Sequence, residues 1–373
     1  MSSLASPEGT RRYVDRLAGA CAPEHFRSWP GAGPSSLRLS SIGMGTYTGP
    51  ADATGDRQYT ESVMEAIRRG INVIDCAINY RNMRSERAVG EGLRELFRAG
   101  EATRDEVWVM TKGGYIPFDG EVPPNPSAYL KRAYIETGIL RPSDIVAGSH
   151  CIAPRYLEDQ LARSLTNLRL EAVDVYFLHS VEQQLDEAPA DEFYSRVAAA
   201  FRMLEGKMAE GKVGCYGVAT WNGFRVPADQ RGHLSLERLM TIAREVGGDG
   251  HGFRVLQLPY NLGMFEALGS ATQLLEGKPV PLFEAAAAYG LAVVVSVPLL
   301  QGKVLPHVPE RFAQRMPDLS TNAQRAIQFV RSTPGVLAPL VGMRQAAHVR
   351  ENAEVAAIAP LSGTAFFELL RER

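Results

Sequence analysis

Short apolar runs alternate with longer amphipathic stretches along the chain, from residue 37 almost to the C-terminus. The apolar runs are nearly continuous in Val, Ile and Leu, which is typical of parallel strands that are covered on both faces. We therefore expect strands at residues 42–46, 72–75, 107–111, 173–178, 213–218, 255–258, 292–297 and 337–341. A possible hairpin over residues 37–42 leads into the first of them.

Each expected strand is followed by a stretch with helical periodicity. In residues 156–168, for example, Leu157, Leu161 and Leu165 form one apolar stripe, and Ser85 is a candidate N-cap for the second helix. The expected helices cover residues 59–69, 85–98, 156–168, 192–210, 236–246, 282–289, 324–331 and 348–358.

Eight successive strand–helix units predict a (β/α)8, or TIM, barrel. A doubly wound sheet is the alternative, but no Gly-x-Gly-x-x-Gly turn opens a helix after any of the strands. The prediction divides the chain into an N-terminal extension at residues 1–36, with a short helix around residues 11–17, and a barrel at residues 37–373. The barrel carries a long insertion rich in Pro and Gly at residues 113–153, and loops of that length are usually functional or partly ordered.

Composition narrows the functional classes. Lys and Arg number 40 against 42 Asp and Glu, and this balance does not favour a nucleic acid or an anionic membrane as partner. The four Cys residues are far apart and no His cluster has ligand spacing, so we expect neither a disulfide framework nor a metal site. No signal peptide and no bilayer-length apolar run is visible, which leads us to expect a cytoplasmic protein. The sequence does not indicate an oligomeric state.

Ionisable residues end three successive predicted strands: Asp75, Lys112 and His179. Tyr80 follows Asp75 closely, and Gln257 lies near the end of the sixth strand. Each residue alone has a structural interpretation as a cap or a solvated group. Together they converge at one rim of a barrel, where the active sites of this fold are built. A Lys ammonium beside a Tyr phenol is expected to lower the phenol pKa from about 10, with Asp75 holding the lysine charged, and this makes a proton donor.

The same residues resemble the catalytic tetrad of the aldo-keto reductase superfamily. The matching segments are residues 72–80 (NVIDCAINY), 84–90 (RSERAVG), 109–112 (VMTK), 174–179 (DVYFLH), 214–218 (GCYGV), 257–261 (QLPYN), 341–344 (VGMR) and 350–352 (REN). The resemblance covers roughly residues 37–358 and follows the order of the predicted strands. It implies that Tyr80 is the general acid for carbonyl reduction, tuned by Lys112 and Asp75, and that His179 orients the substrate carbonyl.

The resemblance also implies a reduced nicotinamide cofactor, NADPH more than NADH. Gln257 and Thr220 would hold its carboxamide, and Arg344, Glu351 and Asn352 would hold the adenosine and its 2′-phosphate, for which the guanidinium is a suitable partner. The helix N-terminus near residue 345 would add its dipole.

Three positions depart from the family pattern. Thr220 stands where a Ser-Asn pair is usual, Ser296 stands where an aromatic ring often stacks on the nicotinamide, and His348 stands where Arg or Gln is common. The expected substrate is a small aldehyde, ketone or alcohol. Two alternatives remain: an NADPH-binding regulatory or interaction protein on the same barrel, and a lyase or isomerase that retains its nicotinamide.

The insertion at residues 113–153 leaves the third strand beside Lys112. Its rings Tyr115, Phe118, Tyr129 and Tyr134 either wall the substrate pocket or pack the insertion onto the barrel. Trp221 after the fifth strand is a further candidate for the pocket wall.

Overall fold

A closed barrel of eight parallel strands forms the centre of the protein, whose computed structural model describes residues 3–29 and 36–371. The strands are β3 (Gly43–Gly45), β4 (Val73–Asp75), β5 (Trp108–Gly113), β6 (Val173–His179), β7 (Val213–Ala219), β8 (Phe253–Pro259), β11 (Ala292–Ser296) and β12 (Ala338–Gly342). Each pairs with the next along the chain, and β12 pairs with β3 to close the circle. The predicted TIM barrel is confirmed, and the strand ends differ from the expected ones by no more than two residues.

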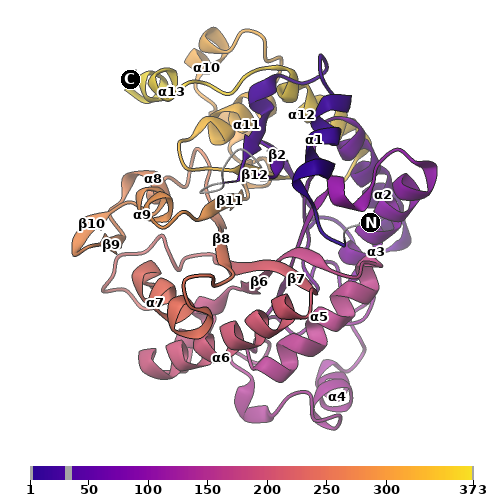
Figure 1. Ribbon diagram of the computed structural model, residues 1–373, viewed down its shortest axis with the longest axis vertical. Coiled ribbons are helices and arrows are strands. Elements are labelled where there is room, and N and C mark those ends of the chain that lie inside the picture. Colours follow the sequence, from indigo (N-terminus) through magenta and orange to yellow (C-terminus); the bar gives the residue numbers. More distant parts are fainter. Residues whose placement is uncertain (1–2, 30–35, 372–373) are drawn as a thin grey trace.

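A ring of helices surrounds the barrel, one after each strand (Figure 1). They are α2 (Ala53–Arg68), α3 (Arg84–Ala99), α5 (Pro154–Leu168), α6 (Ala190–Ala209), α7 (Leu236–Gly247), α9 (Leu282–Ala288), α11 (Asn322–Ser332) and α12 (Ala346–Ala353). Two expectations about helix starts were wrong. α2 begins earlier because Asp52 caps it by accepting from the Gly55 N–H at 2.7 Å. Ser85 is not a cap: it lies inside α3, and its hydroxyl donates to the main-chain oxygen of Thr46 at 2.7 Å.

Side chains along the strands alternate between the barrel interior and the helix layer. Trp108 and Met110 of β5, and Val175 and Phe177 of β6, belong to the interior cluster. The side chains between them face outward, as the two-residue period of a strand requires. This alternation gives each strand two buried faces, which explains its continuous apolar sequence.

The N-terminal segment closes the end of the barrel where the strands begin. β1 (Phe26–Ser28) pairs antiparallel with β2 (Arg38–Ser40), and Trp29 packs edge-on against Trp108 with 5.4 Å between ring centroids. The expected hairpin over residues 37–42 was therefore wrong: its first strand lies within the predicted extension, on the far side of a long connection.

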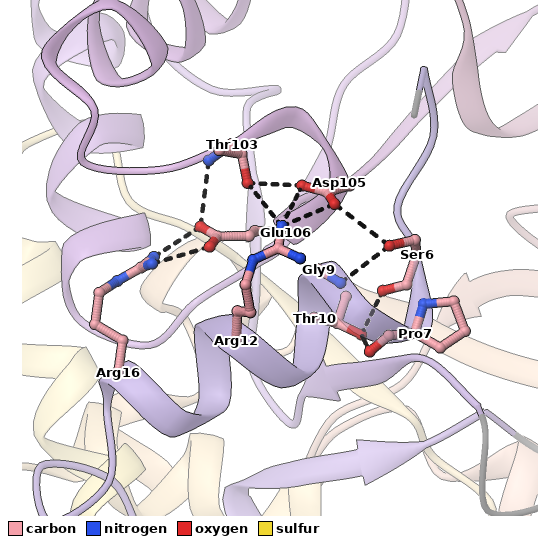
Figure 2. A network of polar contacts seen from close by, with 9 residues as sticks. All are labelled: Ser6, Pro7, Gly9, Thr10, Arg12, Arg16, Thr103, Asp105 and Glu106. Carbon is pink, nitrogen blue, oxygen red and sulfur yellow. Dashed lines mark hydrogen bonds and ion pairs between the residues drawn. The ribbon is translucent and has the colours of Figure 1, made fainter. Parts of the chain in front are cut away.

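Helix α1 (Pro7–Arg16) is attached to the same end of the barrel by polar contacts (Figure 2). Arg12 pairs with Asp105 at 2.8 Å, and Arg16 pairs with the buried Glu106 at 2.7 Å. The Ser6 N–H donates to the main-chain oxygen of Asp105 at 3.0 Å. Both acidic residues belong to the turn η2 (Arg104–Glu106) just before β5, so α1 is fixed to the strand that carries Lys112.

The insertion contains α4 (Pro126–Leu130) and the π-helical turn η3 (Lys131–Ile135), which lie outside the helix ring (Figure 1). The remaining elements are η1 (Pro23–His25), η4 (Pro142–Asp144), η5 (Val181–Asp186), α8 (Glu266–Gly269), β9 (Gln273–Leu275), β10 (Lys278–Val280), η6 (Leu300–Gly302), η7 (Leu305–His307), α10 (Glu310–Arg315), η8 (Glu354–Ala357) and α13 (Gly363–Arg371). Within residues 3–29 and 36–371, no helix has the length and apolar character needed to cross a bilayer.

Candidate active site

The side-chain alternation of the strands brings five polar residues to the mouth of the barrel. Two residues before each of them lies a member of the interior cluster: Val73, Met110, Phe177, Val255 or Val294. The next inward positions, at the carboxyl ends of the strands, are Asp75, Lys112, His179, Gln257 and Ser296. The geometry of the strands is therefore sufficient to gather these groups.

Lys112 lies at the centre of this group and is completely buried. Its Nζ donates to Asp75 Oδ2 at 2.7 Å, to the main-chain oxygen of Cys76 at 2.9 Å and to the Tyr80 hydroxyl at 3.1 Å. An ammonium group has three protons, so all of its donors are used. The lysine is held in one orientation with its charge directed at the Tyr80 phenol.

Tyr80 lies in a loop of unusual backbone conformation between β4 and α3. The three residues that follow it, Arg81, Asn82 and Met83, have φ values of 51°, 56° and 68°. Left-handed conformations are costly for residues other than glycine and persist where surrounding contacts enforce them. One such contact is the buried Arg81 guanidinium, which pairs with Asp56 at 2.7 Å.

The environment of Tyr80 keeps its phenol protonated. Burial raises the pKa of Tyr80 to about 12, although the nearby Lys112 charge acts in the opposite direction. The expected fall below the ordinary value was wrong, because the cost of burying a phenolate exceeds the attraction of the ammonium. Burial is the largest influence on Lys112 and disfavours its charge, but the Asp75 carboxylate and the Tyr80 hydroxyl together outweigh it and the lysine pKa is raised. At neutral pH this is a neutral phenol beside an ammonium.

His179 faces the same space as a neutral imidazole. Burial lowers its pKa well below the ordinary value, and the Lys112 charge and His150 lower it further. Its ring lies edge-on to Tyr80, with 5.8 Å between centroids, and edge-on to Tyr115 at 5.0 Å. Its Nδ1 is buried and has no hydrogen-bond partner among the described residues.

Gln257 is bound directly to the ionic group. Its Nε2 donates to Asp75 Oδ1 at 2.8 Å, so one oxygen of Asp75 holds the lysine and the other holds the glutamine. The sequence predicted a contact between Gln257 and a cofactor but not this bond to Asp75.

A cavity of about 1050 Å³ opens above these residues. Of the predicted site residues it is lined by Asp75, Tyr80, His179, Thr220, Gln257, Ser296 and Arg344. Lys112 lies beneath its floor. The cavity also borders five residues that each carry a buried polar atom without a partner in the described structure: Asn79, His179, Glu182, Gln183 and Thr220. Buried polar atoms are normally paired, so these mark a place where a ligand belongs.

Several lining residues were not identified from the sequence. Tyr47 and Asn79 lie in loops after β3 and β4, and Glu182 and Gln183 follow His179. Glu182 Oε1 accepts the main-chain N–H groups of Trp221 at 2.6 Å and of the next residue at 3.1 Å. In the sequence, these lining residues are marked only by following the carboxyl end of a strand, and many other polar residues do the same.

The far end of the cavity is formed by Arg344, Gln345 and His348, at the start of α12. The main-chain oxygen of Arg344 accepts from the Ser62 hydroxyl at 2.8 Å, whereas its guanidinium makes no hydrogen bond or ion pair with the described residues. Glu351 and Asn352, predicted in the same cofactor-binding segment, do not line the cavity. The carbonyl of Glu351 accepts from Gln324, whereas the buried Oδ1 of Asn352 has no partner in the described part of the chain.

The rings of the insertion have two different environments. Tyr115 lines the cavity beside His179. Tyr134 is fully buried and packs on Tyr129 and on Tyr156 of α5, and Phe118 packs on Tyr129. Only the first of the four rings walls the pocket, and Trp221 joins it there, half exposed.

The sequence of this chain is similar to those of known proteins. The model of the aldo/keto reductase family matches residues 41–228. The NADH-specific methylglyoxal reductase of Escherichia coli is 28% identical over 192 residues, which are 50% of this chain and 50% of that protein. The chain thus spans about half the length of this curated relative. The 6-dehydroglucose reductase of Novosphingobium aromaticivorans is 23% identical over 89% of this chain and 90% of its own.

A solved structure has the same fold. The aldo/keto reductase from Klebsiella pneumoniae in complex with NADP and acetate superposes with a TM-score of 0.58 at 21% identity, over 94% of this chain and 95% of that one. The family model covers half of the chain and includes the strands that carry Asp75, Lys112 and His179. The chain belongs to the aldo/keto reductase family.

Proposed function

We propose that the protein reduces an aldehyde or ketone to an alcohol, with Tyr80 as the acid that protonates the carbonyl oxygen. The observation that carries this proposal is the 3.1 Å contact between the Tyr80 hydroxyl and Lys112 Nζ at the floor of the cavity. A phenol with a pKa of about 12 remains protonated at neutral pH and has a proton to give. The buried ammonium then stabilises the phenolate that forms.

His179 has the complementary task. As a neutral imidazole beside Tyr80, it offers an N–H donor to the same carbonyl oxygen and fixes the direction from which the proton arrives. Tyr115, Tyr47 and Trp221 line the cavity as apolar walls and reduce the access of water to this point.

NADPH is the cofactor that we propose, and when bound it supplies the hydride. The residues of the cavity fit it: Thr220 has a buried hydroxyl without a described partner, and Arg344 at the other end is an unpaired cation suited to a 2′-phosphate. The complex of the Klebsiella relative with NADP supports this choice. Ser296 offers no ring for stacking, so Gln257 and Thr220 are left to orient the carboxamide.

The polar lining favours a carbonyl compound that also carries hydroxyl groups. Asn79, Glu182 and Gln183 each contribute an oxygen atom without a described partner, and all three oxygens are acceptors. The relative named as a 6-dehydroglucose reductase supports a substrate of this type.

The test is turnover of a carbonyl panel, followed by NADPH absorbance, that pairs hydroxylated aldehydes with apolar ones of similar size. We expect turnover with the hydroxylated members preferred, and Tyr80→Phe should lower kcat by about 100-fold or more. Tight NADPH binding without turnover of any carbonyl would contradict the proposal, and so would a Tyr80→Phe variant with nearly normal kcat.

A further inference from the structure

The insertion at residues 113–153 returns to the mouth of the barrel and brings a second histidine to His179. Its two ends pair with each other: the Ile116 N–H donates to the Ser149 oxygen at 2.8 Å, and the Cys151 N–H donates to the Gly114 oxygen at 2.8 Å. This pairing sets Tyr115 opposite His150. The insertion is therefore anchored where it meets the site.

His150 is completely buried and holds the main chain of His179. Its Nε2 lies 2.6 Å from the main-chain oxygen of His179, and its Nδ1 lies 2.8 Å from Gln184 Nε2. The Oε1 of Gln184 accepts from Arg196 at 2.7 Å, which fixes the orientation of this amide. Since the amide nitrogen only donates, Nδ1 of His150 accepts and its Nε2 proton is donated to His179.

The contact occurs where the chain turns sharply. Ser180, directly after His179, has a φ of 47°, and its N–H donates to the Ala219 oxygen at 2.6 Å. Gly114 has a φ of 150°, and a Cβ there would lie 2.7 Å from the His179 oxygen and 2.9 Å from His150 Nε2. Only glycine permits the insertion to approach so closely.

We propose that His150 is a positioning residue for His179: by holding the main-chain oxygen at this turn, it sets the direction of the His179 imidazole in the cavity. The centroid of the Tyr115 ring lies 5.0 Å from that of His179 and 5.2 Å from that of His150, so the insertion contacts both the backbone and the imidazole of His179. The functional consequence rests on the proposed carbonyl reduction; the effect on the imidazole does not.

His25 provides a matched control at the other end of the barrel. It too is completely buried, its Nε2 lies 2.9 Å from the main-chain oxygen of Gly70, and its Nδ1 lies 3.1 Å from the Ser41 hydroxyl. A substitution at His25 costs a similar buried hydrogen bond but lies far from the site.

The experiment compares His150→Leu, His150→Gln and His25→Leu in the full chain. We expect His150→Leu to lower kcat/KM for the best carbonyl of the panel by about 10- to 100-fold, while NADPH affinity changes by no more than about twofold. Glutamine still offers an N–H donor, so His150→Gln should recover most of the loss. His25→Leu should lower the Tm similarly but keep kcat/KM within about twofold of the original.

A second measurement does not depend on turnover. In protein labelled with ¹⁵N-histidine, the imidazole resonances of His179, assigned with His179→Gln, should shift or broaden in His150→Leu and remain unchanged in His25→Leu. Unchanged His179 resonances in His150→Leu would overturn the proposal. So would an equal loss of kcat/KM in both leucine variants. If the original protein reduces no carbonyl, the proposed function fails, and the resonances still decide the role of His150.

Discussion

At the scale of single residues, the feature that dominates the site is a buried lysine whose charge is fully satisfied. The side-chain exposures of Lys112 and Asp75 are 0% and 5%, so neither charge has appreciable solvent. Such a pair costs desolvation energy that is recovered only while both partners are present. The site is therefore most sensitive to the loss of one partner.

Lys112→Met should lower the free energy of unfolding by about 3–5 kcal/mol, because it leaves the Asp75 carboxylate buried without its cation. Adding Asp75→Asn removes the orphaned charge and keeps an acceptor for Gln257. The double variant should therefore be more stable than Lys112→Met alone, as measured by urea unfolding. Strictly additive losses would show that the two charges are not coupled. Asp75→Asn alone completes this comparison, and all three variants should lose reductase activity.

Arg344 is the residue that we expect to make the protein bind NADPH differently from NADH. NADPH carries a 2′-phosphate that the unpaired guanidinium can meet, and NADH does not. A charged hydrogen bond of about 1.5–3 kcal/mol predicts that Arg344→Gln raises the KM for NADPH by about 10- to 150-fold and leaves that for NADH nearly constant. Equal changes in KM for both cofactors, or a clear preference of the original protein for NADH, would show that Arg344 does not bind the 2′-phosphate.

At the scale of elements, the strands were predicted well and their polar ends with them. The strands are mostly apolar runs. Their inward-facing positions, which include Val73, Met110 and Phe177, continue to Asp75, Lys112 and His179 at the strand ends. Period-two geometry converts those sequence positions into one cluster.

The loops were predicted poorly, for physical reasons. The roles of Glu182 and His150 depend on contacts between segments far apart in sequence, such as the bond from the Trp221 N–H to Glu182. The pKa of Tyr80 depends on burial, which no spacing reveals. β1 and β2 have only three residues each, which is too short for a period-two pattern to show in the sequence.

Helix α1 offers a test of how the N-terminal element is attached. A Cβ on Gly9 would lie 2.2 Å from the main-chain oxygen of Asp105, whereas one on Gly206 in α6 would meet nothing within 4 Å. Alanine favours a helix over glycine by about 0.5–1 kcal/mol, so Gly206→Ala should stabilise the protein by that amount. Gly9→Ala should instead destabilise it by about 1–3 kcal/mol through steric conflict. Urea unfolding measures both.

Activity distinguishes attachment from catalysis in these two variants. Because α1 lies at the end of the barrel where the strands begin, Gly9→Ala should leave kcat unchanged and should increase proteolysis within residues 3–29. If the Gly9→Ala protein were as stable as the original, the backbone at Asp105 would be able to move away from the new methyl group without loss of stability.

At the scale of the whole molecule, the barrel has the cavity at one end and the N-terminal segment at the other, and each end contains a buried histidine. His25 lies beneath the strands beside Arg331, and His150 lies beside the cavity. Burial lowers the pKa of His25 to about 3 and that of His150 to about 4. Both are therefore neutral in the folded protein well below the ordinary histidine value.

Because of these two histidines, and of His179 whose pKa burial also lowers, we expect the stability of the protein to fall on mild acidification. Between pH 6.5 and about 4 the unfolded chain binds a proton at each histidine and the folded protein does not, so the free energy of unfolding decreases by about 1.4 kcal/mol per pH unit and per histidine. Stability is complete above the unfolded pKa. Urea unfolding from pH 7 to pH 5 should show this slope, and His25→Gln or His150→Gln should each remove about one histidine's share of it. A variant less stable than the original but with the same slope would mean that the removed histidine is protonated in the folded protein.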